Sequence, residues 1–416
     1  MFNFITFKSL RNRAFTSFLC ILSIALSVSL YLGIQRLRKG AEDGFTNTIS
    51  KTDFIVGAKG GAINLLLYSV FHMGQAVNNV RYTTYETIKN HPTVKWTIPI
   101  SLGDSYKGYR VVGTDENFYQ HYRFRGDQVV ELDQGKIATG VFDVILGSDV
   151  ANKLKHKVGD KIVLTHGIQA EGLYHHDQTP FEVTGILKKT HTPIDKSVYV
   201  SLLGMEAMHI GWESGVPDNR VIDKTAFSPE NLQIKQITAF MVGLKNRIAI
   251  LRMRRTIDTF EDEPIMAIIP SLTLQELWQT LSYVEKVLSV VGLLVLIVGF
   301  LTIVIAIYTS INERRREMSI FRSLGAHPWQ ILGLILYESF LLVFMGILLG
   351  IAGLYALITS LKPILEKEFS VFIEVQPLNK EEYIFLAIVL LIAPLIGLIP
   401  GFRAYKNSLR DGLTIK

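Results

Sequence analysis

The segment Val287–Ile307, VLSVVGLLVLIVGFLTIVIAI, decides the fold of this chain, because its 21 residues include no charge. As an α-helix the segment is about 31 Å long, which matches the hydrocarbon core of a bilayer. Three further stretches are similarly apolar and carry at most one charge each: Ala14–Ile34, Ile331–Ile358 and Tyr383–Pro400. The sequence therefore predicts four transmembrane α-helices, of which the last is short and contains Pro394.

The composition agrees with a membrane protein. Of the 416 residues, 49% are hydrophobic and 19% are charged, and the mean hydropathy is +0.28. These values exclude a disordered chain and disfavour an ordinary soluble enzyme. The single cysteine, Cys20, excludes an intrachain disulfide and a cysteine-based zinc site. The net charge of +6 is modest and gives no reason to expect a nucleic-acid partner.

A large domain is inserted between the first two spans. Residues 35–282 contain no transmembrane segment and are numerous enough to form their own hydrophobic core. Short runs with strand composition alternate with helical patterns, which predicts an external α+β domain of two lobes. The expected strands are Val94–Pro99, Tyr109–Gly113, Lys161–Thr165, Phe181–Leu187, Ser197–Val200 and Ile237–Leu244. The expected helices are one that starts with the capping box Thr83–Glu86, Asp149–Leu154 and Arg247–Asp258.

The distribution of Lys and Arg predicts the topology. Basic residues are more frequent in residues 1–13, 309–330 and 401–416 than in the segments on the other side, which include the loop 359–382. By the positive-inside rule, both termini and the segment 309–330 are cytoplasmic, and the inserted domain is external. The first span could instead be a cleaved signal peptide, but its apolar run is long and no A-x-A site follows. We therefore expect an uncleaved anchor.

The second span, 283–308, is expected to extend beyond the membrane as a stalk. Thr273 and Glu276 have the spacing of a capping box, and no Pro or Gly lies between Leu274 and Val291. A helix over Leu274–Ile307 would be about 51 Å long, roughly 20 Å more than the hydrocarbon core needs. The alternative is a break near Ser282.

The segment Asn312–Pro328, NERRREMSIFRSLGAHP, lies between the second and third spans. Met318, Phe321 and Leu324 recur every three residues after a charged block, which predicts a short amphipathic helix. Gly325 would end this helix, and Pro328 suits the first turn of the next one. From the residues alone, the helix could bind a partner or simply lie on the bilayer surface.

The run Glu313–Ala326, ERRREMSIFRSLGA, resembles the coupling helix of ABC-transporter permeases of the MacB/LolC/FtsX type. The layout is also similar, with one span, a large external domain and then three spans. The tail resembles the closing motif of that family through Pro400, Ala404 and residues 411–413. Two departures are visible: Met318-Ser319 replaces the usual aliphatic–Gly pair, and Leu409 stands where Pro is common.

The resemblance implies a dimer, either of this chain or with a paralogous permease, in the bacterial inner membrane. The dimer would bind separate ABC ATP-binding subunits, which hold ATP and Mg²⁺. It would pass their motion to the external domain, which acts on an envelope substrate such as a lipoprotein or a peptide. The resemblance assigns docking of the ATPase to nine residues: Glu313, Arg314, Arg315, Glu317, Ile320, Phe321, Arg322, Leu324 and Gly325.

Several enzyme motifs are missing from the sequence. It contains no G-x-x-x-x-G-K-[ST], no H-E-x-x-H and no G-x-S-x-G. We therefore expect no catalytic residues and no ATP site in this chain. An alternative within the same family is an FtsX-like signalling scaffold that activates an external envelope enzyme and moves no substrate.

Two further groups of residues invite a functional interpretation. Glu338 lies inside the third predicted span, where a carboxylate is costly, and we expect a structural or coupling role rather than ion translocation. In the external domain, imidazole and carboxylate groups that are competent zinc ligands gather in one stretch: His166, His175, His176, Asp177 and His191. A solvated loop with adventitious histidines is the alternative. The sequence also resembles a branch of the family that accompanies zinc-responsive genes, which makes a zinc-linked transport system a further alternative.

Overall fold

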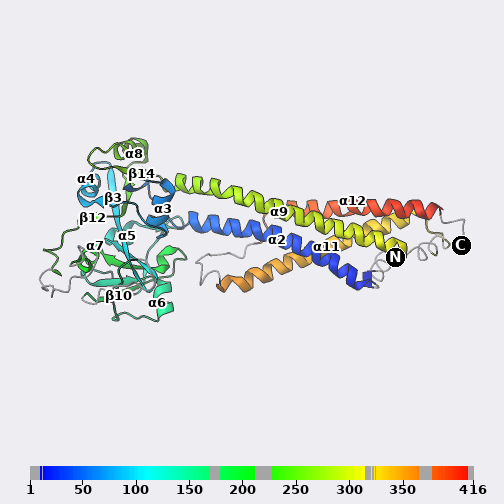
Figure 1. Cartoon of the computed structure of the whole chain (residues 1–416), viewed down its shortest axis with the longest axis horizontal. Coiled ribbons are helices and arrows are strands. Elements are labelled where there is room, and N and C mark those ends of the chain that lie inside the picture. Colours follow the sequence, from blue (N-terminus) through cyan, green and yellow to red (C-terminus); the bar gives the residue numbers. More distant parts are fainter. Residues whose placement is uncertain are drawn as a thin grey trace. The chain divides into compact units, whose positions relative to one another are not determined.

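The computed structural model describes residues 10–11, 13–167, 179–210, 227–313, 320, 323, 325–364 and 377–410. The chain divides into two compact units (Figure 1). One is built from Ala41–Thr280, and we call it the inserted domain. The other, which we call the helical unit, is built from Met1–Gly40, Leu281–Leu365 and Ile373–Lys416.

The inserted domain is organised around one ten-stranded mixed sheet. The strand order is β14-β1-β13-β3-β4-β11-β8-β10-β7, and β9 pairs with β10 at the side. β11 is parallel to β4 and β10 is parallel to β8, whereas the other neighbours are antiparallel. The strands are β1 (Phe54–Ala58), β3 (Val94–Tyr106), β4 (Tyr109–Thr114), β7 (Leu132–Gly135), β8 (Asp143–Leu146), β9 (Lys161–Ile162), β10 (Phe181–Leu187), β11 (Ser197–Ser201), β13 (Ala239–Leu244) and β14 (Ile265–Ile268). Two small pairs lie outside this sheet: β2 (Val80–Arg81) with β12 (Gln236–Ile237), and β5 (Arg123–Phe124) with β6 (Gln128–Val129).

Both faces of the sheet are buried. In β11, Val198 and Val200 belong to the core on one face, while Tyr199 belongs to the core on the other. Apolar side chains at successive positions therefore all find partners, as expected for strands that are covered on both sides. Residues of α3 (Ala62–Val70) and α5 (Glu116–His121) join the core on one face. Four of the described helices cover the other face: α4 (Tyr82–Lys89), α6 (Ser148–Leu154), α7 (Leu202–Met208) and α8 (Ile250–Asp258). The domain also contains the short 3-10 helices η1 (Pro193–Lys196) and η3 (Arg247–Ala249).

The two lobes expected from the sequence are two halves of this sheet, joined by β3. The first part of this 13-residue strand pairs with β13 and the second part with β4. Between Leu102 and Ser105 the pairing with β4 shifts by one residue, so Gly103 and Asp104 form a β-bulge. A bulge bends its strand and redirects a side chain, and here it redirects a carboxylate.

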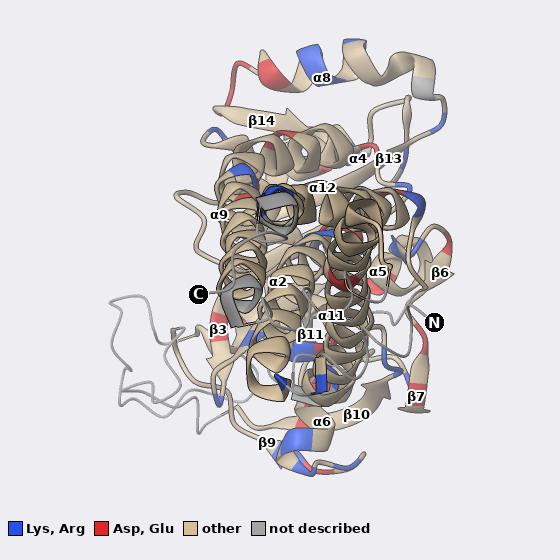
Figure 2. Cartoon of the chain, turned by 90° about the vertical axis from the view of Figure 1, so that its right-hand side faces the viewer, with Lys and Arg blue, Asp and Glu red and all other residues tan. Residues whose placement is uncertain are grey.

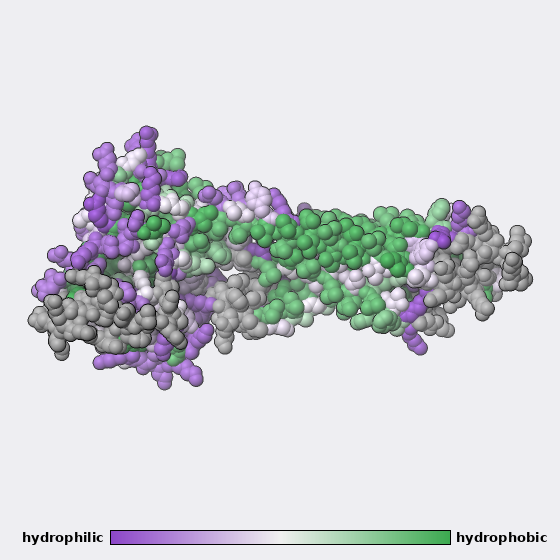
Figure 3. Space-filling view, in the orientation of Figure 1, coloured by the Kyte–Doolittle hydropathy of each residue, from purple (hydrophilic) through white to green (hydrophobic). Residues whose placement is uncertain are grey.

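The helical unit is built from four long helices, two of which continue into the residues of the inserted domain, and they confirm the four predicted spans. They are α2 (Ala14–Thr46), α9 (Pro270–Glu313), α11 (Pro328–Ile364) and α12 (Lys380–Arg410). Within the described residues, each is long and apolar enough to cross a membrane. Viewed along their length, these helices carry few charged residues (Figure 2), and the face that Figure 3 shows is largely apolar. Such a surface suits lipid rather than water.

The helices are longer than the predicted spans. α9 runs unbroken for 44 residues, or about 66 Å, which confirms the expected continuity past Ser282. α2 continues to Thr46, beyond the predicted end at Ile34, because the charged residues that follow the apolar run do not interrupt a helix. Both predicted capping boxes are wrong. α9 begins at Pro270 rather than at Thr273, and the N-cap of α4 is Arg81.

Glycines allow the helices to approach closely. Gly346 and Gly350 form a G-x-x-x-G pair on α11 that faces α2. A Cβ at Gly346 would lie 2.7 Å from the Cβ of Ile24, and one at Gly350 would lie 2.8 Å from the carbonyl oxygen of Ala25. Within lipid, helices associate through such contacts rather than through the hydrophobic effect.

We predict that Gly350→Ala destabilises the helical unit by about 1–3 kcal/mol, because the added methyl group overpacks the contact with α2. Gly333→Ala on the same helix is the matched control, since a Cβ there meets no atom within 4 Å. That change should be neutral or stabilising by up to about 1 kcal/mol, as alanine favours helix over glycine. Thermal unfolding of the two variants in detergent measures the difference, and equal midpoints would contradict the close contact.

Candidate functional site

The segment that resembles a coupling helix lies between α9 and α11. Glu313 is the last residue of α9, which extends past the predicted end of the span at residue 308. Pro328 is the first residue of α11, in the first turn as predicted. Gly325 has a φ of +92°, the left-handed conformation that ends many helices. Ile320 is 57% exposed, as a side chain that binds a partner must be. The other predicted docking residues lie outside the described part of the chain: Arg314, Arg315, Glu317, Phe321, Arg322 and Leu324.

The C-terminal part of α12 contacts the helices on both sides of this segment. The guanidinium of Arg403 lies 4.6 Å from the centre of the Tyr308 ring on α9, in a cation–π arrangement. The ring of Tyr405 packs against that of Trp329 at the start of α11, with 5.2 Å between their centres. A displacement of the coupling segment would therefore act on α9, α11 and α12 together.

Glu338 is buried in the interior of the helical unit. Its side chain is 5% exposed, and the neighbouring Ser339 is fully buried against α12. Gly397 of α12 provides the space for the Ser339 side chain, because a Cβ at position 397 would collide with the Ser339 hydroxyl. The structural or coupling role of Glu338 stays a prediction, because burial of an intramembrane carboxylate is expected for either role.

A second buried charged group joins α2 to the start of α12. Arg36 forms a bidentate ion pair with Glu382, with Nε–Oε1 at 2.8 Å and Nη2–Oε2 at 2.9 Å. The two side chains are only 10% and 5% exposed. Glu382 also accepts a hydrogen bond from the backbone N–H of Asn379, whose side chain caps Glu382 in return. This capping box fixes the carboxylate at the N-terminus of α12, where the helix dipole favours negative charge.

We predict that Arg36→Ala destabilises the protein by about 3–5 kcal/mol, because it leaves the Glu382 carboxylate buried without its cation. Arg38→Ala is the control. Arg38 pairs with Glu285 at 2.9 Å, but these side chains are 45% and 22% exposed, so its loss should cost at most about 1 kcal/mol. Thermal unfolding in detergent distinguishes the two variants. A small effect of Arg36→Ala, similar to that of Arg38→Ala, would show that the buried pair is not important for stability.

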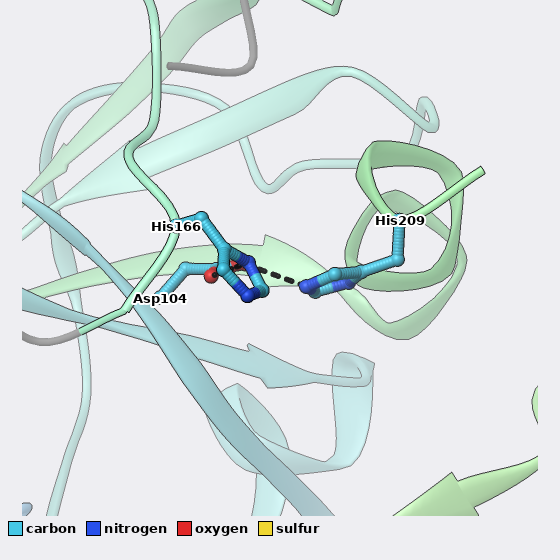
Figure 4. A group of neighbouring side chains, drawn as sticks. All are labelled: Asp104, His166 and His209. Carbon is cyan, nitrogen blue, oxygen red and sulfur yellow. Dashed lines mark ion pairs between the residues drawn. The ribbon is translucent and has the colours of Figure 1, made fainter. Parts of the chain in front are cut away.

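In the inserted domain, Asp104, His166 and His209 converge on one point (Figure 4). Asp104 comes from the bulge of β3 and is fully buried. His166 follows Thr165, whose backbone forms two hydrogen bonds with Ser105 and so fixes the loop beside the bulge. His209 is the C-cap residue of α7. The three side chains, each of a type that can bind a metal ion, therefore come from three separate elements.

Each of the two imidazoles faces a different oxygen of the Asp104 carboxylate. Nδ1 of His166 is 3.3 Å from Oδ1 of Asp104, and Nε2 of His209 is 3.2 Å from Oδ2. Burial lowers the pKa of His209, but the hydrogen bond and charge of Asp104 raise it, and the net shift is upward. On the opposite side of the ring, Nδ1 of His209 lies 2.7 Å from the carbonyl oxygen of Met205.

The predicted zinc ligands are only partly brought together. Among the described residues, His166 joins the cluster and His191 does not; the backbone N–H of His191 donates to Asp195 at 2.7 Å. His175, His176 and Asp177 lie outside the described residues. Asp104 and His209 were not predicted from the sequence. The bulge that redirects Asp104 depends on pairing between strands, and no local sequence motif predicts it.

Two family models match the chain. The MacB-like periplasmic core domain matches residues 17–243, and the FtsX-like permease C-terminal model matches residues 289–411. The first alone covers more than half of the 416 residues. The chain therefore belongs to the ABC-transporter permeases of the MacB/FtsX type. It is a multi-pass bacterial membrane protein and a permease subunit.

Two solved structures show some likeness to this chain. The periplasmic region of MacB from Actinobacillus actinomycetemcomitans is 10% identical, with a TM-score of 0.34 over 55% of this chain and 94% of that chain. The extracellular domain of the noncanonic ABC-type transporter YknZ from Gram-positive bacteria is 11% identical, with a TM-score of 0.31 over 52% and 98%. No curated protein matches this chain.

Proposed function

We propose that this permease subunit couples ATP hydrolysis by a separate ATPase chain to movement of the inserted domain. The observation that carries the proposal is α9. This helix begins two residues after β14 of the inserted domain and continues without a break to Glu313, where the coupling segment starts. A continuous helix transmits a displacement that a loop would absorb.

The coupling segment is the proposed docking site for the ATPase. Its apolar residues Ile320, Phe321 and Leu324 would fill a groove on the ATPase, as in other helix-in-groove complexes. The charged residues Glu313, Arg314, Arg315, Glu317 and Arg322 would surround that contact. Tyr308 and Trp329 connect its two ends to α12, so a displacement of the docked segment would reach all three helices.

The proposed orientation places the coupling segment and both termini in the cytoplasm and the inserted domain outside the inner membrane. This follows from the excess of Lys and Arg on the coupling side. ATP and Mg²⁺ would be held by the partner, and the permease would act as a dimer or with a paralogous chain. Its substrate would be an envelope component such as a lipoprotein or a peptide.

Purification from the native host tests the partners. The detergent-solubilised chain should retain an ATP-binding subunit, and any external protein that co-purifies is a candidate for the envelope substrate. Stimulation of the ATPase rate by that protein supports transport. A rate that does not respond, together with activation of a bound external enzyme, would favour a signalling scaffold.

We predict that the double variant Phe321→Asp with Leu324→Asp still inserts into the membrane but no longer retains or stimulates the ATPase. Two carboxylates would have to be desolvated in an apolar groove, which is strongly unfavourable. The matched control is Ile248→Asp with Leu251→Asp, which has the same spacing. These side chains are 90% and 75% exposed in the inserted domain, and their replacement should leave ATPase binding unchanged. ATPase co-purification and hydrolysis rates measure both effects, and normal values in the first variant would refute the docking role.

A further inference from the structure

We propose that Asp104, His166 and His209 form a binding site for a divalent transition-metal ion, and that zinc is the ion these ligands suit best. This proposal goes beyond the coupling function and does not depend on it. Two imidazole nitrogens and a carboxylate oxygen can approach one point, since their ligand atoms lie within 4.8 Å of one another.

The spacing of the ligand atoms fits a zinc ion. Zinc binds nitrogen and oxygen ligands at about 2.0–2.2 Å with tetrahedral geometry, so two of its ligands are roughly 3.3 Å apart. Nδ1 of His166 lies 3.3 Å from Oδ1 of Asp104, and Nε2 of His209 lies 3.2 Å from Oδ2, the other oxygen of the same carboxylate. The ligand atoms, all within 4.8 Å of one another, would need to approach by at most about 1.5 Å to reach the spacing of a zinc site.

The surroundings hold two of the ligands in place. Nδ1 of His209 donates to the carbonyl oxygen of Met205 at 2.7 Å, which keeps a proton on that nitrogen and leaves Nε2, on the side of Asp104, as the nitrogen that can bind an ion after it loses its proton. Metal-bound histidines commonly have such a carbonyl partner on the second nitrogen. The carboxylate of Asp104 is held by the backbone N–H of Gly167 at 3.3 Å. The bulge of β3 fixes its direction.

The ligand set also selects the class of ion. Imidazole suits zinc and its neighbours in the first transition series, whereas calcium and magnesium require oxygen ligands. Asp104 is fully buried, but the side chains of His166 and His209 are 38% and 33% exposed. An ion can thus enter from solvent, and a water molecule can complete its coordination. Bound metal would join β3, the loop after β9 and the end of α7.

The competing explanation is a carboxylate flanked by two imidazole rings, which needs no metal. The two explanations differ in one measurable respect. An ion-pair cluster should show no preference for zinc over magnesium, whereas the proposed site should bind zinc selectively.

The test uses the full-length chain in detergent, without a polyhistidine tag, titrated with Zn²⁺ against a chromophoric chelator. We expect the wild type to bind Zn²⁺ and ignore Mg²⁺, and His166→Ala and Asp104→Asn to lower the affinity by roughly tenfold or more. His166 is partly exposed, so its replacement should leave the fold intact. The matched control is His191→Asn, which removes an imidazole outside the cluster and should change the affinity less than twofold. Asn is chosen because residue 191 has a φ of +57°, which Asn tolerates.

A second readout is thermal unfolding, since an ion that binds the folded chain raises its midpoint. Zn²⁺ should raise the midpoint of the wild type and of His191→Asn more than that of His166→Ala. Equal zinc affinity and equal midpoints in the wild type, His166→Ala and Asp104→Asn would overturn the proposal. No selective zinc binding by the wild type would also overturn it. Neither result would affect ATPase docking, which is measured separately.

Discussion

The backbone hydrogen bonds of α9 are the constraint on which the account depends. In lipid, every peptide group must find its partner within the helix, so the spanning part of α9 cannot break. Outside the lipid the sequence adds its own restriction, because no Pro or Gly interrupts the helix between Leu274 and Val291. The result is one stiff helix of 44 residues, which begins shortly after β14 along the chain and ends where the coupling segment starts. A hinge anywhere along α9 would remove the mechanical connection that the proposed function requires.

The two units are stabilised by different physical effects. The inserted domain buries both faces of its sheet, so its stability comes mainly from apolar area removed from water. The helical unit has no such driving force in lipid and relies on close backbone contacts at Gly346 and Gly350. The buried Arg36–Glu382 pair adds a specific polar connection between α2 and α12. The proposed function requires packing inside each unit that is rigid enough to pass motion on.

Features set by local physics could be predicted from the sequence, whereas features set by tertiary pairing could not. The length of the apolar runs predicted four spans, and β10 was predicted with its exact bounds. The prediction that a capping box at Thr273 starts α9 was wrong, because Pro270 is itself a favourable first helical residue. The prediction of a capping box at Thr83 was also wrong, because the backbone of Arg81 is fixed by its pairing with Gln236. The histidine-rich stretch indicated metal ligands, but only the fold places His166 beside Asp104 and His209.

The central claim is that hydrolysis of ATP by a partner moves the inserted domain relative to the helical unit. Because Cys20 is the only cysteine, a Cys20→Ser background allows two spin labels to be placed at will. Val77, 74% exposed in the inserted domain, and Tyr383, 58% exposed on α12, are suitable positions. The distance between the labels should be measured in vesicles that contain the ATPase, with and without ATP. The account predicts a distance distribution that shifts with ATP. An unchanged distribution during active hydrolysis would contradict it.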